Sequence, residues 1–166
     1  MLSDLFMQTG AVFSPCKTYR YRLWRTWDAT KKPIVFLMLN PSIADENQND
    51  PTVERCQRRA MSLGFGQLQV VNIFSLISTD PRGLYTCDDP VGPENNAAIQ
   101  EAVKGADTVV CAWGTHGGHV DRAREVVGLL KVAGVNPQCL GLNSDGSPKH
   151  PLYVSYSVAP MPYDLT

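Results

Sequence analysis

The chain has 166 residues, of which 43% are apolar and 19% are charged. This size and balance predict one globular domain over residues 1–166 and argue against a disordered or fibrous chain. No apolar run approaches the roughly 20 residues that a membrane-spanning helix needs, and residues 1–10 do not resemble a signal peptide. We therefore expect a soluble, cytoplasmic protein with no membrane partner.

The net charge of −1 by itself predicts no nucleic-acid partner. The charge is uneven, however, because residues 1–35 carry +4 and the remainder carries −5. The basic residues near the start either contact phosphates or form a solvated strand face; they are Arg20, Arg22, Arg25, Lys31 and Lys32. The five cysteines are widely spaced and form no Cys-x-x-Cys pair, so we expect reduced thiols.

The first predicted elements are a strand, a second strand and a helix. Apolar and polar residues alternate over residues 18–23, which predicts a half-exposed strand or hairpin arm. Residues 34–39, IVFLML, are continuously apolar, as in a strand covered by helices on both faces. Asp50 then precedes Pro51 as a helix cap, and the helical pattern that follows ends at Gly64.

The rest of the chain alternates between apolar runs of strand length and helical patterns that end at glycine. The expected elements are strands at residues 69–74, 108–113 and 138–142, a helix from Pro93 to Gly105, and a helix after the turn at 114–118 that ends at Gly134. This order predicts an α/β fold of three layers, α/β/α, with a central four-stranded parallel sheet and an extra N-terminal antiparallel strand or hairpin.

Polar residues occupy the ends of the predicted central strands. Ligands of parallel sheets bind beyond the carboxyl ends of the strands, where loops and helix N-termini meet. Asn40 follows the first central strand, Asn72 lies near the end of the second, and His116 follows the third. Asp45 and His150 lie in loops expected at the same edge, so we expect all five side chains on one rim.

Four motifs in consistent order resemble those of the uracil-DNA glycosylase superfamily. They are Asn40-Pro41, Val70-Val71-Asn72, Ala112-Trp113-Gly114 and His150-Pro151-Leu152. The resemblance covers about residues 33–153 and implies that fold, with Asn40 placing the attacking water, Asn72 reading the base edge and His150 stabilising the leaving base. The Asn-Pro form is typical of the mismatch-specific, thymine-DNA-glycosylase-like branch. Longer strings, such as Asp89–Asn95, resemble the bacterial and phage family known as domain of unknown function 1643, whose name supplies no activity.

The chemistry of base excision suits these residue types. Cleavage of an N-glycosidic bond places positive charge on the sugar and negative charge on the departing base, so the enzyme needs a positioned water and a donor at the base oxygen. His150 can donate, and Asn72 offers both a donor and an acceptor to a flipped base. An amide is a poor base, so Asn40 needs help from a carboxylate such as Asp45 or Asp50, the latter also expected as a helix cap.

The base pocket departs from the superfamily pattern. In the well-known uracil enzymes an aromatic residue follows the first motif and excludes a 5-methyl group, but Ser42 or Ile43 stands there in this chain, which implies thymine or a larger 5-substituted pyrimidine. The stacking aromatic expected between Pro41 and Gly64 is also missing. Its candidate replacements are Phe65, Phe74 and Tyr153. The residues expected to contact the base are Pro41, Ser42, Asn72 and Phe74.

Phosphate contacts are expected at the glycine turn and at the late His-Pro motif, which lacks the serine that usually follows it. These residues are Gly114, Thr115, His116, Pro151 and Leu152. The three histidines and the carboxylates lack metal-ligand spacing, so we expect no metal and no cofactor.

The main hypothesis is a DNA base-excising glycosylase that acts on a modified or mismatched pyrimidine, with DNA as its partner. One alternative is a noncatalytic nucleotide- or base-binding module, which the acidic bulk of the chain and the missing stacking aromatic favour. The other alternative is a hydrolase or transferase that acts on free nucleosides.

Overall fold

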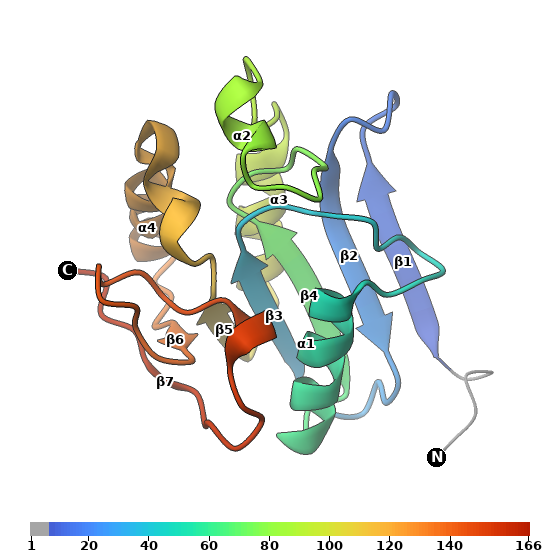
Figure 1. Cartoon of the computed structure of the whole chain (residues 1–166). Helices are drawn as coiled ribbons and strands as arrows, with labels where there is room; N and C mark the ends of the chain where they lie inside the picture. Colours follow the sequence, from blue (N-terminus) through green and yellow to red (C-terminus); the bar gives the residue numbers. More distant parts are fainter. Residues whose placement is uncertain (1–6) are drawn as a thin grey trace.

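The computed structural model, which describes residues 7–166, contains one mixed sheet with the strand order β1-β2-β4-β3-β5-β6-β7 (Figure 1). Strands β4, β3, β5 and β6 pair in parallel, whereas β1, β2 and β7 pair antiparallel at the two sides. The strands are β1 (Gln8–Phe13), β2 (Arg20–Thr26), β3 (Pro33–Met38), β4 (Gln67–Asn72), β5 (Thr108–Cys111), β6 (Gln138–Cys139) and β7 (Met161–Pro162).

Helices pack on both faces of the sheet. On one face, apolar residues of α1 contact β3, β4 and β5, and on the other face those of α3 and α4 contact the same strands. The helices are α1 (Pro51–Ser62), α2 (Gly83–Thr86), α3 (Asn95–Lys104) and α4 (Arg122–Val132), with 3₁₀ segments η2 (Thr115–Asp121) and η3 (Pro151–Tyr153). The prediction of an α/β fold is confirmed, and the sheet is mixed and seven-stranded.

The local signals in the sequence explain the central elements. In β3, Ile34 to Met38 are buried because helices cover both faces of this strand. Asp50 caps α1, as its carboxylate accepts the backbone N–H of Val53 at 2.8 Å and Pro51 takes the first helical position. Gly64 follows the end of the helix with a φ of 88°, a conformation that glycine adopts without strain.

A solvated strand face was one expectation for the basic residues near the N-terminus, and this expectation is wrong for two of them. Arg20 and Arg25 are each only 2% exposed. The physical reason is that β2 lies between β1 and β4, and the segment after β3 folds over it and supplies backbone acceptors from Ala44 and Asp45. The other basic residues are more exposed: Arg22 bonds to Gln69, Lys31 pairs with Asp28 and Lys32 pairs with Asp107.

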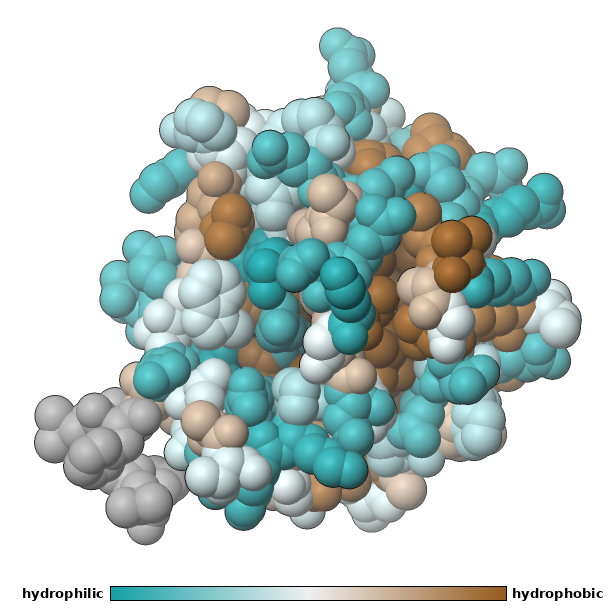
Figure 2. Space-filling model, turned by 180° about the vertical axis from the view of Figure 1, so that it is seen from behind, coloured by the Kyte–Doolittle hydropathy of each residue, from teal (hydrophilic) through white to brown (hydrophobic). Residues whose placement is uncertain are grey.

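Some elements differ from the sequence expectation. The fourth parallel strand, β6, has only two residues, and α2 and β7 carry no clear pattern in the sequence. All five cysteines are free, as predicted. None of the helices described is both long and apolar enough to span a bilayer. Figure 2 shows the back of the molecule, where hydrophilic residues cover most of the surface and hydrophobic ones gather on one side.

Candidate active site

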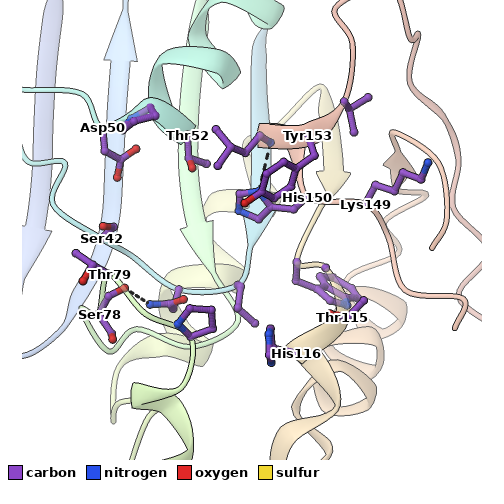
Figure 3. Close-up of a pocket in the computed structure, with 18 of the residues that line it drawn as sticks. Ser42, Asp50, Thr52, Ser78, Thr79, Thr115, His116, Lys149, His150 and Tyr153 are labelled. Atoms are coloured by element: carbon purple, nitrogen blue, oxygen red, sulfur yellow. Dashed lines mark hydrogen bonds between the residues drawn. The ribbon is translucent and has the colours of Figure 1, made fainter. Parts of the chain in front are cut away.

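A cavity of about 640 Å³ opens beyond the carboxyl ends of β3 and β5, where the sequence predicted a site (Figure 3). Its walls come from the segment after β3, the start of α1, the loop before α2, the start of η2 and the loop that leads into η3. This volume is typical of small-molecule sites. The polar side chains in the lining are Asn40, Ser42, Asp50, Thr52, Ser78, Thr79, Thr115, His116, Asn143, Lys149, His150 and Tyr153.

Asn40 presents an oxygen to this cavity. Its Nδ2 donates to three backbone carbonyls, those of Pro41 at 3.0 Å, Leu76 at 3.3 Å and Ser78 at 2.9 Å. Carbonyl oxygens only accept hydrogen bonds, so these contacts fix the orientation of the amide. The Oδ1 atom accepts no hydrogen bond from any described residue, and it is left to bind a water or a ligand donor.

His150 presents a donor to the same cavity. Its Nδ1 accepts the backbone N–H of Leu152 at 3.2 Å, so this nitrogen carries no proton and the neutral ring is protonated on Nε2. Burial lowers the pKa of His150 below its usual value of 6.5, although the charge of Asp50 opposes that shift. At neutral pH the imidazole is therefore uncharged and offers its Nε2–H.

The carboxylate of the cavity comes from Asp50. This side chain is 6% exposed and lies at the N-terminus of α1, where one oxygen caps the helix. Its other oxygen has no hydrogen-bond partner among residues 7–166, and the residue lines the cavity. Figure 3 shows Thr52 between Asp50 and His150. The first turn of α1 and its cap therefore form part of the cavity wall.

Asp45, expected as the catalytic carboxylate, does not line the cavity. Its Oδ1 accepts the backbone N–H groups of Asn47 and Gln48, each at 2.8 Å, and these bonds lower the pKa of its carboxyl group. Asp45 therefore orders an exposed turn. The sequence analysis considered Asp50 beside it, and the structure brings Asp50 to the site.

Three residues expected at the base also lie outside the lining. Asn72 is 3% exposed, and its Oδ1 accepts from the Arg20 guanidinium at 3.5 Å while its carbonyl accepts from Asn95. Phe74 is fully buried in the core between the sheet and α3 and α4. Pro41 is buried, and its carbonyl accepts from Asn40. The expectation that Asn40, Asn72 and His150 surround one cavity is thus wrong for Asn72, because this side chain is buried beside Arg20, which donates to its oxygen, and it does not line the cavity.

Buried arginines hold the wall that carries Asp50. Arg20 donates to the carbonyl of Ala44 at 3.0 Å. Arg25 donates to the side chain of Asn49 at 2.9 Å and to the carbonyls of Asp45 and Gln48. Because a buried cation without partners is costly, these bonds fix the segment between β3 and α1.

The wall that carries His150 is fixed from α1. Arg55 donates to the carbonyls of Pro151 and Val154, and Arg59 donates to those of Val154, Ser155 and Val158. Both guanidinium groups also lie against the ring of Tyr156, at 4.4 Å and 5.4 Å. The same helix that places Asp50 at its N-terminus thus places η3 and His150.

The expected phosphate contacts lie in part at the cavity. Gly114, Thr115, His116 and Leu152 line it, whereas Pro151 is buried against α1 and lies outside the lining. His116 also bonds through Nδ1 to the Tyr85 hydroxyl at 3.0 Å, which ties α2 to η2. Ser42, expected at the base, lines the cavity as well.

Several lining residues were not singled out by the sequence analysis. Thr52 was the easiest to find, since it follows the predicted cap and proline of α1. Asn143 and Lys149 lie in a long loop with no periodic pattern, and Ser78 and Thr79 lie in the polar loop before α2. No group of three or more His, Cys, Asp or Glu side chains in the described chain is arranged to hold a metal ion.

Comparison with known families gives one match. The model of the family described as "Protein of unknown function (DUF1643)" matches residues 20–152. The chain belongs to this family. The match runs from β2 through most of η3, so it includes every residue named above in the lining of the cavity except Tyr153. No curated protein and no solved structure matches the chain.

Proposed function

We propose that this protein hydrolyses the N-glycosidic bond of a pyrimidine base, and that its substrate is a modified or mismatched base flipped out of DNA. The observation that carries the proposal is the meeting of three groups in one cavity: the free Oδ1 of Asn40, the carboxylate of Asp50 and the Nε2–H of neutral His150. They provide a water acceptor, a base and a donor.

Each group has one part in the reaction. Asn40 Oδ1 and Asp50 hold a water, and Asp50 accepts a proton from it as the water oxygen bonds to C1′ of the sugar. The C1′–N bond breaks and its electron pair goes to the base, whose oxygen accepts a hydrogen bond from His150. The neutral imidazole can fill this role because its Nε2–H donates a hydrogen bond to the developing anion although the ring itself carries no charge.

The fold supports the same proposal. We infer a uracil-DNA-glycosylase-like arrangement in which β4, β3, β5 and β6 form the parallel centre, Asn40-Pro41 follows β3 and Trp113-Gly114 follows β5. The base-reading role suggested for Asn72 is not part of this proposal, because that side chain is enclosed with Arg20.

The test is base release from oligonucleotides that contain uracil, a thymine mismatch or a bulky 5-substituted pyrimidine, with alkali to cut the abasic site. We expect release from at least one substrate, and a loss of 100-fold or more in rate for His150→Ala. Asp45→Ala is the control, since Asp45 lies outside the cavity. Intact strands with every substrate at enzyme excess would refute the proposal, and tight binding without release would favour a noncatalytic module.

One observation favours a free nucleoside as the substrate instead. Lys149 is the one Lys or Arg that lines the cavity in the described part of the chain, so few cations stand ready for a phosphate backbone. A protein that neutralises several DNA phosphates loses affinity steeply as salt rises. A flat salt dependence of DNA binding, with release of base from free nucleosides, would select this second function.

A further inference from the structure

The two edges of the sheet differ in how far they are protected. One edge is β7, which has two residues and contains Pro162, so it offers little backbone to a further strand. The other edge is β1, which has six residues, none of them charged and none of them proline (Figure 1). No strand among residues 7–166 pairs with its outer side. Its outward backbone groups are therefore open to another strand.

The pairing of β1 with β2 is regular over five residues and is centred on Gly10. Successive residues from Gln8 to Val12 lie opposite successive residues from Thr26 to Arg22, and the register shifts only beyond Val12. Five residues in regular register give the outer side of β1 a straight ladder of N–H and C=O groups. This ladder has the same number of residues on either side of Gly10.

An aromatic ring lies across the glycine at this centre. Gly10 is opposite Trp24, and a Cβ added to Gly10 would be 2.1 Å from Cζ2 of the indole. The indole therefore reaches from β2 across β1 toward the edge of the sheet. The Arg22 guanidinium lies 5.8 Å from the Trp24 ring and donates to Gln69, which holds this arrangement. Trp24 belongs to neither hydrophobic core, and Val12 on the same face is 40% exposed.

We propose that β1 is a self-association surface and that its partner is the β1 strand of a second copy of this chain. In an antiparallel pair about a two-fold axis, opposed residues point to the same face, and a pair centred on Gly10 uses the whole regular stretch. Gly10 then opposes Gly10 of the second copy, and Gln8 opposes Val12. Because neighbouring strands lie about 4.8 Å apart, the two Trp24 rings, each across its own glycine, meet edge to edge above the junction.

The charge of the edge favours a second copy over a charged partner. β1 carries no charge, so two copies bring no like charges face to face, and an acidic or basic ligand gains no ion pair with the strand. The pair joins two seven-stranded sheets and places tryptophan and arginine side chains near its centre, as protein interfaces do. No residue of β1 or β2 lines the cavity, so the inference is independent of the proposed function.

The experiment compares two double variants that share one substitution. Both contain Val12→Asp, which lies opposite Arg22 within one subunit. In Gln8→Glu/Val12→Asp, the proposed register sets carboxylates opposite each other at two places in the dimer, whereas Gln8→Lys/Val12→Asp sets a cation opposite a carboxylate at the same places. Sedimentation equilibrium from about 1 to 200 µM protein gives the dissociation constants, since an interface formed by one pair of strands is small and weak.

We expect a monomer–dimer equilibrium for the wild-type protein. The dissociation constant of Gln8→Glu/Val12→Asp should exceed that of Gln8→Lys/Val12→Asp by about tenfold or more. Melting temperatures check that both variants fold. A wild-type protein that stays monomeric over the whole concentration range, or equal dissociation constants for the two double variants, overturns the inference. Base release enters neither result, so the proposed function stands or falls separately.

Discussion

Asp50 has two roles that substitution can separate, the cap of α1 and the proposed base. In Asp50→Ser, the hydroxyl can still accept the N–H of Val53, but the carboxylate is gone from the cavity. In Asp50→Ala, both the cap and the carboxylate are lost. If both roles are correct, the two variants therefore differ in stability but lose the same factor in the rate of base release.

The magnitudes follow from the structure. Loss of an N-cap costs about 1 kcal/mol, and the removed charge at the helix N-terminus costs a further few tenths to about 1 kcal/mol. For a chain of this length, 1 kcal/mol changes the melting temperature by about 2–4 °C. Asp50→Ala should melt about 3–8 °C lower than the wild-type protein, and Asp50→Ser should lose about a quarter to a half as much. Removal of a general base should slow base release 100-fold or more in both.

The assay pairs thermal unfolding with single-turnover base release at enzyme excess, on the best substrate found for the wild-type protein. Asp45→Ala serves as the control, because the Asp45 carboxylate accepts hydrogen bonds in an exposed turn and does not line the cavity. Release by Asp50→Ser at a rate within a few-fold of wild type would refute the role of Asp50 as base, whatever its effect on α1.

Three further predictions concern other groups. Burial holds the pKa of His150 below the unfolded value of 6.5, so the unfolded chain binds more protons than the folded one as the pH falls. The contribution of neutral His150 to stability should therefore be lost as the pH falls from about 6.5 through the lowered folded pKa. In urea unfolding between about pH 7.5 and 5, the free energy of unfolding should fall less steeply with pH in His150→Gln than in the wild-type protein. Arg122 is 1% exposed and donates to the carbonyl of Ile73 and to the side chain of Asn95, so Arg122→Met should destabilise the fold by about 3 kcal/mol. Loss of the exposed ion pair with Glu54 in Arg58→Ala should leave the urea midpoint almost unchanged. Equal urea midpoints for these two arginine variants would contradict that reasoning. Asp45→Ala should lower the melting temperature only slightly, through the loss of its turn hydrogen bonds, and leave base release within a few-fold of wild type, as measured by the same two assays.

The elements around the site could be predicted because their signals are local. The apolar run of β3 and the cap and proline of α1 each follow from neighbouring residues, and they place Asn40 and Asp50 at the ends of their elements. Since carboxyl ends of parallel strands meet at one edge, the cavity lies where this order of strands and helices predicted it. His150 was found through its motif and does line the cavity.

The partners of the buried polar groups could not be predicted, because they depend on contacts between distant segments. Asn72 looked like a ligand-binding amide in the sequence, but β2 pairs with β4 and brings the Arg20 guanidinium to it across 52 positions of chain. The segment after β3, which folds over β2, buries Arg20 and Arg25, two of the basic residues for which a solvated face was one of the two expectations.

The sequence by itself determined the order of the central strands and of α1, α3 and α4, the capping of α1 and the end of the sheet at which polar residues gather, since all of these depend on periodicity and neighbouring residues. Only the tertiary structure decided that Asp50 rather than Asp45 faces the cavity, that Asn72 is enclosed and that Tyr153 is exposed at the mouth. The physical reason is that a side chain's exposure and its hydrogen-bond partners depend on which segments pack against it, and those segments lie far away in the chain.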